Sequence, residues 1–424
     1  MKGKSFLSTS TSPDRAYLRN FSAQAGAGRG AYPKRKPQSA PQKQASGKMK
    51  WFEVGMGIDM PFLLIVLLLL AIGILMMFSA SYPVALAEEG NSYYYLVRQT
   101  IFAVIGVSIM IAVSFVNYHW FYRFAVFIAG LAVFLLIIVI PITWGQDLHR
   151  WIPLGIVDLQ PSEVAKFAVI VFFAYWGAKY HDKMKYMKYS LVPGLAAFGI
   201  LALLLVLEPH YSGIVIMFCL ILFMLWFAGM SPVYFFYIIV FGVGLVLLAY
   251  VTGILGYAME RMDGWGLALS CSPDDYDMWW ATWQTRNSLY AIGSGGLTGL
   301  GLGKSRQKYL YLPEPQNDFI FAIVCEELGF IIAALILVLF GVLVWRGVYI
   351  SQRSGDTFGK LLGCGLSAQI GLQVILNILV ITDWLPNTGI SLPFFSYGGS
   401  SLVMLLAQMG VVLSVSRTSK IEKV

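Results

Sequence analysis

The sequence predicts an all-α integral membrane protein that crosses the bilayer about ten times, and three observations support this class. The mean hydropathy is +0.70. Hydrophobic residues make up 58% of the chain and charged residues only 12%, whereas soluble domains contain about 25% charged residues. Apolar runs of roughly the 20 residues needed to cross a bilayer recur along the 424-residue chain. A water-soluble core cannot hold so many of them, so the bilayer must be the solvent.

The candidate spans are separated by short polar segments, apart from one loop of about sixty residues at 256–317, between the seventh and eighth spans. Loops of that length tend to be functional or disordered, and the aromatic and glycine clusters in this one favour order. The ten spans are Pro61–Tyr82, Val97–Val116, Phe121–Ile142, Gln160–Tyr180, Ser190–Leu207, Tyr211–Ala228, Pro232–Leu255, Asp318–Trp345, Lys360–Ile381 and Gly398–Ser416.

Clusters of lysine and arginine set the orientation of the spans. They follow the fourth, eighth and tenth spans, on the same side of the membrane as the basic amino-terminal tail. Because positive residues collect in cytoplasmic loops, we expect both termini in the cytoplasm and the loop at 256–317 outside. The clusters are Lys179, Lys183, Lys185 and Lys188, then Arg346, Arg353 and Lys360, then Arg417, Lys420 and Lys423.

The amino-terminal tail, residues 1–58, accounts for more than the whole net charge of +8, because its first fifty residues carry eleven lysines and arginines and a single acid, Asp14. It is rich in Ser, Ala, Gly, Gln and Pro, so we expect it to be disordered and to lie against anionic membrane lipid on the cytoplasmic side. Sparse aromatic residues argue against a nucleic-acid-binding arm. The membrane domain is then 59–417, followed by a short cytoplasmic tail, 418–424.

Metal and disulfide patterns are not visible in the sequence. The four cysteines have no metal or disulfide spacing, and the four histidines are scattered, which argues against a zinc site. The cysteines are Cys219, Cys271, Cys325 and Cys364. The acids of the loops could hold Mg²⁺ through their oxygen atoms, although no spacing requires it. We therefore expect no obligatory cofactor and leave a divalent cation open.

The segment Tyr309–Phe321 places Asp318 where a polar loop becomes the apolar eighth span. The carboxylate is therefore expected at the outer membrane surface. Two interpretations are open: a helix N-cap that accepts hydrogen bonds from unpaired backbone amides, and a catalytic acid or base. The spacing alone favours neither.

Glu326 and Glu327 fall eight and nine positions into the same span. Ionisable groups inside the bilayer are costly and usually face a cavity or a partner. Pairing with a buried lysine or arginine and a substrate or ion role are both open. Adjacent helical positions diverge by about 100°, so the two side chains are expected on different faces.

A second set of polar residues surrounds the start of the fourth span. Arg150 and Trp151 stand on an outward loop, and Gln160, Glu163 and Lys166 recur at helical spacing, so the last three share one face. Such a stripe indicates a lined cavity. A buried Glu163–Lys166 pair that fixes helix packing is the alternative.

The glycine-rich run 293–303 is followed by Lys304, Arg306 and Lys308. Glycines let a backbone approach a phosphate closely, and the cations could neutralise it. However, no nucleotide-binding pattern surrounds the run, and a turn-rich loop is the favoured interpretation. Ser400 and Ser401, at the start of the tenth span, could bind a substrate, or the small residues there could simply allow close packing.

Together these segments resemble the SEDS family, which includes FtsW, RodA and SpoVE. The motifs follow the family order over about 59–417: Arg150-Trp151-Ile, Gln160-Pro-Ser-Glu, Leu-Pro-Glu314, Asp318-Phe-Ile-Phe, Glu326-Glu327-Leu-Gly and Pro393-Phe-Phe-Ser-Tyr-Gly-Gly-Ser-Ser. Phe395 and Ser396 are more similar to the FtsW and SpoVE branch. In two places the chain departs from the family pattern: Asn317 replaces the usual threonine, and the Trp-rich stretch Gly264–Trp283 is longer.

The resemblance implies a peptidoglycan glycosyltransferase that polymerises lipid II at the outer face of the bacterial cytoplasmic membrane, in cell division or sporulation. It implies a class B penicillin-binding transpeptidase and other divisome proteins as partners, and Asp318 as the catalytic acid. A lipid II flippase or other transporter, and a non-catalytic scaffold for the transpeptidase, are the alternatives. The expected substrate-binding residues are Arg150, Trp151, Gln160, Ser162, Glu163, Lys166, Lys308, Glu314, Ser400 and Ser401, with Glu326 and Glu327 as structural or cavity acids.

We expect Asp318 to accept the proton of the attacking sugar hydroxyl as a general base. Arg150, Lys166 and Lys308 are the cations expected to stabilise the departing diphosphate.

Overall fold

The computed structural model of the chain describes residues 57–142, 150–153, 158–251, 264–272 and 274–418. The chain divides into two units, 1–49 and 50–424, and every described residue belongs to the second. The expected disordered tail therefore lies outside the described residues, apart from its last two positions, and so does the carboxyl-terminal tail, apart from its first residue.

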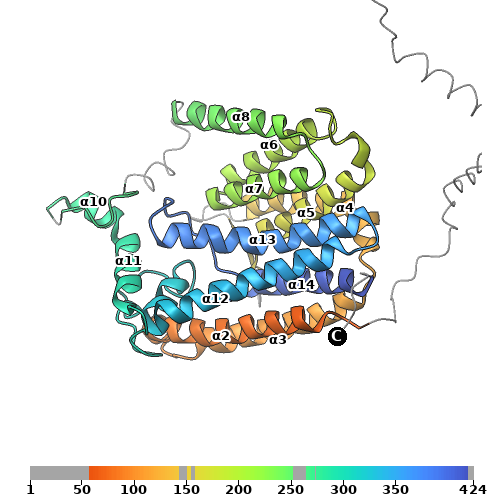
Figure 1. Ribbon diagram of the computed structural model, residues 1–424. Coiled ribbons are helices and arrows are strands. Elements are labelled where there is room, and N and C mark those ends of the chain that lie inside the picture. Colours follow the sequence, from red (N-terminus) through yellow and green to blue (C-terminus); the bar gives the residue numbers. More distant parts are fainter. Residues whose placement is uncertain (1–56, 143–149, 154–157, 252–263, 273, 419–424) are drawn as a thin grey trace, which may run out of the picture. The chain divides into compact units, whose positions relative to one another are not determined.

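Within the described ranges, each predicted span is a helix (Figure 1). The boundaries agree to within a few residues, except that two helices are longer: the first extends to Glu89 and the eighth to Gln352. The helices are α2 (Met60–Glu89), α3 (Tyr94–Phe115), α4 (His119–Ile142), α5 (Pro161–Lys179), α6 (Leu191–Leu207), α7 (Tyr211–Phe227), α8 (Pro232–Val251), α12 (Ile320–Gln352), α13 (Thr357–Ile381) and α14 (Gly399–Thr418).

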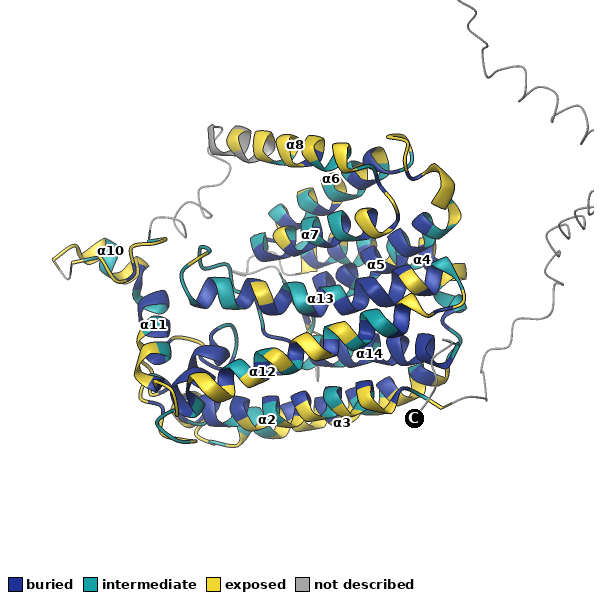
Figure 2. Ribbon diagram, in the orientation of Figure 1, coloured by how far each residue is buried: buried dark blue, intermediate teal, exposed yellow. Residues whose placement is uncertain are grey.

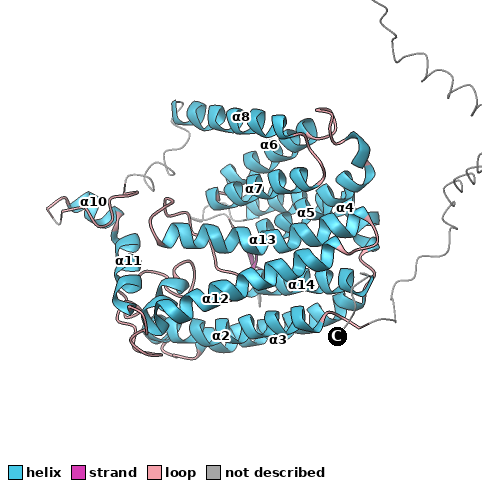
Figure 3. Cartoon of the chain, in the orientation of Figure 1, coloured by secondary structure: helices cyan, strands magenta, loops and turns pink. Residues whose placement is uncertain are grey.

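Six of these helices, α2, α3, α4, α12, α13 and α14, are long and apolar enough to cross a membrane, and the segments Leu191–Leu207, Tyr211–Phe227 and Pro232–Gly244 are shorter apolar helices. The protein is therefore a multi-pass membrane protein. The remaining elements are short: β1 (Ile152–Pro153), β2 (Asp158–Leu159), η1 (His181–Lys183), α10 (Tyr276–Ala281) and α11 (Trp283–Gly295). Figure 3 shows how completely helix dominates the described chain.

Burial separates the central helices from the peripheral ones. Of the most apolar 18-residue window, 72% is buried in α14 and 67% in α13, but only 22% in α3 and in α4. Figure 2 shows the same contrast, with α13 and α14 largely dark blue and α8 largely yellow. The exposed faces of the peripheral helices carry large apolar side chains, such as Val104 and Phe127, as a lipid-facing surface requires.

Polar side chains fix the ends of the helices. Asp59 precedes α2, and its carboxylate accepts a hydrogen bond from the backbone amide of Phe62 at 3.0 Å, which satisfies one of the amides left unpaired at a helix start. The same carboxylate pairs with Arg346 of α12 at 2.8 Å. Asp356 caps α13 in the same way, through the amide of Gly359 at 3.2 Å. These contacts tie together the ends that we expect on the cytoplasmic side.

The strand pair was not predicted, and it has a clear positioning role. Strands β1 and β2 are antiparallel, with Ile152 opposite Leu159. The pairing brings Trp151, which precedes β1, beside Gln160, which follows β2. The pair Arg150 and Trp151 is thus placed beside the polar residues at the start of α5.

Candidate functional site

A cavity of about 800 Å³ lies among the predicted site residues, within the range of small-molecule sites. Its walls come from the starts of α3 and α14, the β1–β2 segment, and the segments before α7, α12 and α14. The predicted residues that line it are Arg150, Trp151, Gln160, Glu314, Asp318 and Ser401. Residues that the sequence reasoning did not single out as site residues also line it, including Arg98, Asp158, His210, Gln284, Asn387 and Tyr397.

Asp318 is half-buried and faces this cavity. It lies one position before Phe319, the residue that occupies the N-cap position of α12, so the N-cap interpretation is not supported. The buried amide of Asn377 on α13 donates to the backbone carbonyl oxygen of Asp318 at 2.8 Å and to that of Ile390 at 2.7 Å. One side chain therefore holds both Asp318 and the 382–398 connection.

The 382–398 connection forms the wall beside Asp318. The hydroxyl of Ser396 donates to the carbonyl oxygen of Asn317 at 2.6 Å, and the amide of Tyr397 donates to that of Gln316 at 2.9 Å. Gly389 has a φ of +70°, and a Cβ atom there would lie 2.8 Å from Oδ2 of Asp318. Only glycine fits without strain at this backbone conformation and this distance.

We expect Gly389→Ala to destabilise the protein through two effects, a left-handed backbone cost of about 1–2 kcal/mol and the clash with the Asp318 carboxylate. Gly90→Ala is the matched control, because Gly90 has a φ of +67° but nothing within 4 Å of its Cβ position. Chemical denaturation should show the larger loss for Gly389→Ala. Adding Asp318→Ser should recover part of the difference; no recovery would mean that the carboxylate does not press on position 389.

Two arginines line the cavity near Asp318. Arg150 donates to the carbonyl oxygen of Pro209, in the segment between α6 and α7. Arg98 lies near the start of α3, is exposed, and packs over the ring of Tyr94 with 4.4 Å to its centroid. Arg98 was missed in the sequence, although a signal existed: in the expected orientation this arginine stands at the outward end of a span, a placement that the positive-inside rule disfavours.

A smaller cavity of about 50 Å³ extends the site along α5. Gln160, His210, Gly389 and Ser391 line both cavities. The extension also contains the expected residues Ser162, Glu163 and Lys166. Lys166 Nζ lies 2.7 Å from Glu163 Oε1, and the two side chains are only 5% and 10% exposed. The two interpretations of this stripe are therefore compatible, because the buried ion pair itself lines the cavity.

Glu208 and His210 lie beside the cavities, in the segment between α6 and α7. Burial raises the pKa of the Glu208 carboxyl from its ordinary value of 4.5 to about 8, and the nearby charge of Arg150 opposes the shift. Neither carboxyl oxygen has a hydrogen-bond partner among the described residues. Burial, followed by the charges of Arg150 and Lys166, lowers the pKa of His210 to about 3. Both side chains are therefore neutral near pH 7.

The raised pKa of Glu208 predicts that stability depends on pH. The folded protein holds a proton that the unfolded chain releases, so this contribution is complete below about pH 4.5 and falls as the pH rises through 8. We expect the unfolding midpoint of the wild type to decline across this window and that of Glu208→Gln to decline less. Glu89→Gln, which changes an exposed acid, should retain the wild-type slope. Equal slopes for Glu208→Gln and the wild type would contradict the shift.

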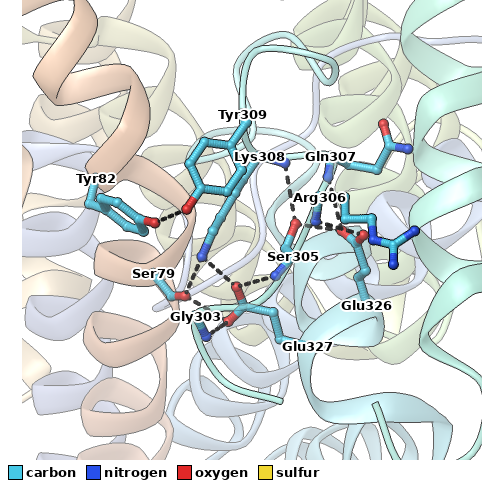
Figure 4. Close-up of polar contacts among 10 residues, drawn as sticks. All are labelled: Ser79, Tyr82, Gly303, Ser305, Arg306, Gln307, Lys308, Tyr309, Glu326 and Glu327. Atoms are coloured by element: carbon cyan, nitrogen blue, oxygen red, sulfur yellow. Dashed lines mark hydrogen bonds and ion pairs between the residues drawn. The ribbon is translucent and has the colours of Figure 1, made fainter. Parts of the chain in front are cut away.

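Lys308, Glu326 and Glu327 form a separate buried network (Figure 4). Lys308 Nζ lies 2.7 Å from Glu327 Oε1, and both side chains are fully buried. The hydroxyl of Ser79 on α2 donates to the other carboxylate oxygen of Glu327 at 2.6 Å. Lys308 therefore does not line the cavity of Asp318, which corrects the expectation that it contacts a departing diphosphate there.

Both acids bind the same loop, although adjacent helical positions were expected to face apart. Glu326 accepts hydrogen bonds from the Ser305 hydroxyl and from the Arg306 amide at 2.9 Å. Glu327 accepts from the amides of Gly303, at 2.9 Å, and Ser305, at 3.3 Å. The loop curves around this turn of α12, so it meets both side chains.

The glycine-rich run serves this packing and not a phosphate. Cβ atoms at Gly295 and Gly299 would lie 2.0 and 2.2 Å from backbone oxygens of α12. The amide of Leu300 donates to the carbonyl oxygen of Glu326 at 3.0 Å. Gly329, with a φ of +77°, interrupts α12 at the point of contact. Because the backbone amides of Leu300 and Gly303 already donate to α12, the interpretation of this run as a phosphate-binding loop is not supported.

Removing Lys308 should strongly destabilise the protein. Lys308→Met leaves the Glu327 carboxylate buried without its countercharge, a change that typically costs 3–5 kcal/mol. The double variant Lys308→Met with Glu327→Gln should be clearly more stable than Lys308→Met alone. Lys304→Met, at an exposed neighbouring position, is the control in a denaturant titration. A loss equal to that of the control would refute the structural role.

The two serines of the tenth span have different positions. Ser401 lines the larger cavity, and its hydroxyl donates to the carbonyl oxygen of Gly398 at 3.2 Å. Ser400 is buried, and its hydroxyl donates to the carbonyl oxygen of Asp158 at 2.6 Å, so it fixes β2 and does not line the cavity. Among the residues that the structure describes, no three His, Cys, Asp or Glu side chains gather in a way that could hold a metal ion.

Comparison with known proteins gives consistent matches over most of the chain. The family model described as "Cell cycle protein", for FtsW, RodA and SpoVE, matches residues 60–421. Stage V sporulation protein E of Bacillus subtilis (strain 168) is 38% identical, over 85% of this chain and 98% of that protein. A protein named "Probable peptidoglycan glycosyltransferase FtsW" from Geobacter sp. (strain M18) is 35% identical, over 85% of this chain and 97% of its own length.

The fold also matches a solved structure. A chain from "Structural coordination of polymerization and crosslinking by a peptidoglycan synthase complex" superposes with a TM-score of 0.65 at 22% identity, covering 85% of this chain and 98% of that one. At that identity the likeness supports the fold alone.

Proposed function

The chain belongs to the FtsW, RodA and SpoVE family of cell cycle proteins, and from this premise we propose that it polymerises lipid II in the cavity around Asp318. It is a peptidoglycan glycosyltransferase, as relatives at 33–35% identity are named, and it acts in cell division or sporulation. The observation that carries the placement of the site is the cavity of about 800 Å³ in which Asp318 and two arginines, Arg98 and Arg150, share one lining.

The chemistry requires a base and a cationic environment. A sugar hydroxyl of one lipid-linked substrate attacks the anomeric carbon of a second lipid-linked substrate. A new glycosidic bond forms, and the bond from that carbon to the polyprenyl diphosphate breaks. Asp318 accepts the proton of the attacking hydroxyl. Arg98 and Arg150 stabilise the negative charge that develops on the leaving diphosphate. Arg98 takes the role that the sequence reasoning gave to Lys308.

The other residues that line the two cavities bind and orient the sugar. Gln160, Ser401 and Trp151 supply hydrogen bonds and an apolar surface for the disaccharide, and the acid Glu314 lines the same cavity. Ser162, Glu163 and Lys166 line the smaller extension, where the ion pair keeps the local charge balanced. Such a cavity binds and orients an uncharged sugar between charged groups that act on the reacting atoms.

We place the cavity at the outer face of the bacterial cytoplasmic membrane, with both termini in the cytoplasm. The lysine and arginine clusters support this orientation. We further propose that the protein works beside a class B penicillin-binding transpeptidase, because the strand that it makes is the substrate for crosslinking. A chain of similar fold occurs in a peptidoglycan synthase complex described as coordinating polymerization and crosslinking.

Asp318→Asn tests the proposal. It keeps the size of the side chain and removes the base, so purified protein supplied with labelled lipid II should polymerise about 10²- to 10⁴-fold more slowly with an unchanged unfolding midpoint. Asp277→Asn, which changes an exposed acid on α10, should retain the wild-type rate.

Three outcomes would count against the proposal. A wild-type rate in Asp318→Asn would remove the assignment of the base. Movement of lipid II across vesicles without polymer would favour a flippase. A wild type that only recruits the transpeptidase and makes no polymer with it would favour a scaffold.

A further inference from the structure

The 303–311 segment packs one side against α2 and α12 and leaves the other side exposed. Its inward side is fully used, because four backbone amides, two serine hydroxyls and Lys308 satisfy Glu326 and Glu327 (Figure 4). The side chains of Lys304 and Arg306 are exposed and form no ion pair or hydrogen bond with described residues. With Tyr309 and Tyr311 they line a surface cavity of about 670 Å³. We call these four residues the cationic face.

The charge of this face is unusual for its side of the membrane. In the proposed orientation, the described outward segments contain few exposed lysine or arginine side chains. Apart from those that line the Asp318 cavity, these are Lys304 and Arg306. Outward segments are normally poor in such residues, and no acid of the described chain neutralises these two. A positive pair in this position is therefore available for an anionic ligand.

The depth of the face in the membrane indicates the source of that ligand. The 303–311 segment contacts α2 through Ser79 and Tyr82, and the Tyr82 hydroxyl is hydrogen-bonded to that of Tyr309. Ser79 lies nineteen residues after Met60, the first residue of α2, and a rise of 1.5 Å per residue separates them by about 28 Å. A bilayer core is about 30 Å thick. The face therefore lies at the level of the outer lipid phosphates, where tyrosine is also favoured.

The cationic face adjoins the proposed reaction site. Tyr311 lines the face and Pro313 lines the Asp318 cavity, and two residues of chain span at most about 7 Å. Leu312, between them, is fully buried, which fixes the segment. Polymerisation needs two lipid-linked reactants at once, and the Asp318 cavity supplies cations for one diphosphate. A second diphosphate needs its own cationic site within reach.

We propose that the cationic face binds the diphosphate of the second lipid-linked substrate molecule while the first occupies the Asp318 cavity. This inference rests on the proposed function. Two cations match the two charges of a diphosphate diester, whereas most phospholipid headgroups carry a single phosphate charge. The buried Lys308–Glu327 network holds the face in place before binding, which reduces the ordering cost of binding.

The test is a binding stoichiometry measured on the full-length protein in phosphatidylcholine nanodiscs, with undecaprenyl diphosphate as the probe and native mass spectrometry as the readout. We expect two probe molecules per wild-type chain and one in the double variant Lys304→Gln with Arg306→Gln. The apparent KM for lipid II should rise about tenfold or more, since charge-assisted hydrogen bonds are lost, with little change in kcat. Lys185→Gln with Lys188→Gln, which removes two exposed charges from the other side, should behave as wild type.

Several results would overturn the inference. Two probe molecules on the double variant would exclude the face as a diphosphate site. Displacement of the second probe by an equal concentration of phosphatidylglycerol would identify a general phospholipid site. A double variant that retains two probe molecules but loses stimulation by a transpeptidase would identify a protein-binding surface. A wild type that binds two probe molecules but makes no polymer would instead contradict the proposed function.

Discussion

The fully buried ion pair between Lys308 and Glu327 is the interaction on which the position of the 303–318 segment depends. A lysine and a glutamate without water are stable only when each compensates the other and the remaining donors and acceptors are satisfied. Here the hydroxyl of Ser79 and the backbone amides of Gly303 and Ser305 complete the set around Glu327. Because the lysine belongs to the loop and the acid to α12, the pair determines where the loop lies, and with it the chain that leads to Asp318.

A second constraint acts at the far end of that segment. The side chain of Asn377, deep in α13, binds the carbonyl oxygens of Asp318 and Ile390, and Gly389 leaves just enough space for the carboxylate. The loop is therefore fixed at its start by a charge pair and at its end by neutral hydrogen bonds. Just before the charge pair, the side chains of Lys304 and Arg306 remain exposed and free to meet a ligand.

The spans and their order could be read from the sequence because the hydropathy of a segment depends only on the residues that it contains. Which side of a loop faces the protein cannot be predicted in this way. Lys308 was assigned to the substrate because it follows glycines and cations, yet its neighbours Lys304 and Arg306 point outward while it is buried. Glu326 and Glu327 were expected to diverge, but the loop wraps around both. Arg98 was missed because it belongs to a span that contributes no motif.

The contacts that orient the aspartate bind carbonyl oxygens, and every amino acid has one. Ser396 binds the carbonyl of position 317 and not its side chain. Family members that usually carry threonine at that position and this chain with asparagine can therefore keep one active-site frame. Evolution can therefore vary the side chain next to the proposed base without disturbing the hydrogen bonds that hold the backbone of that base in place.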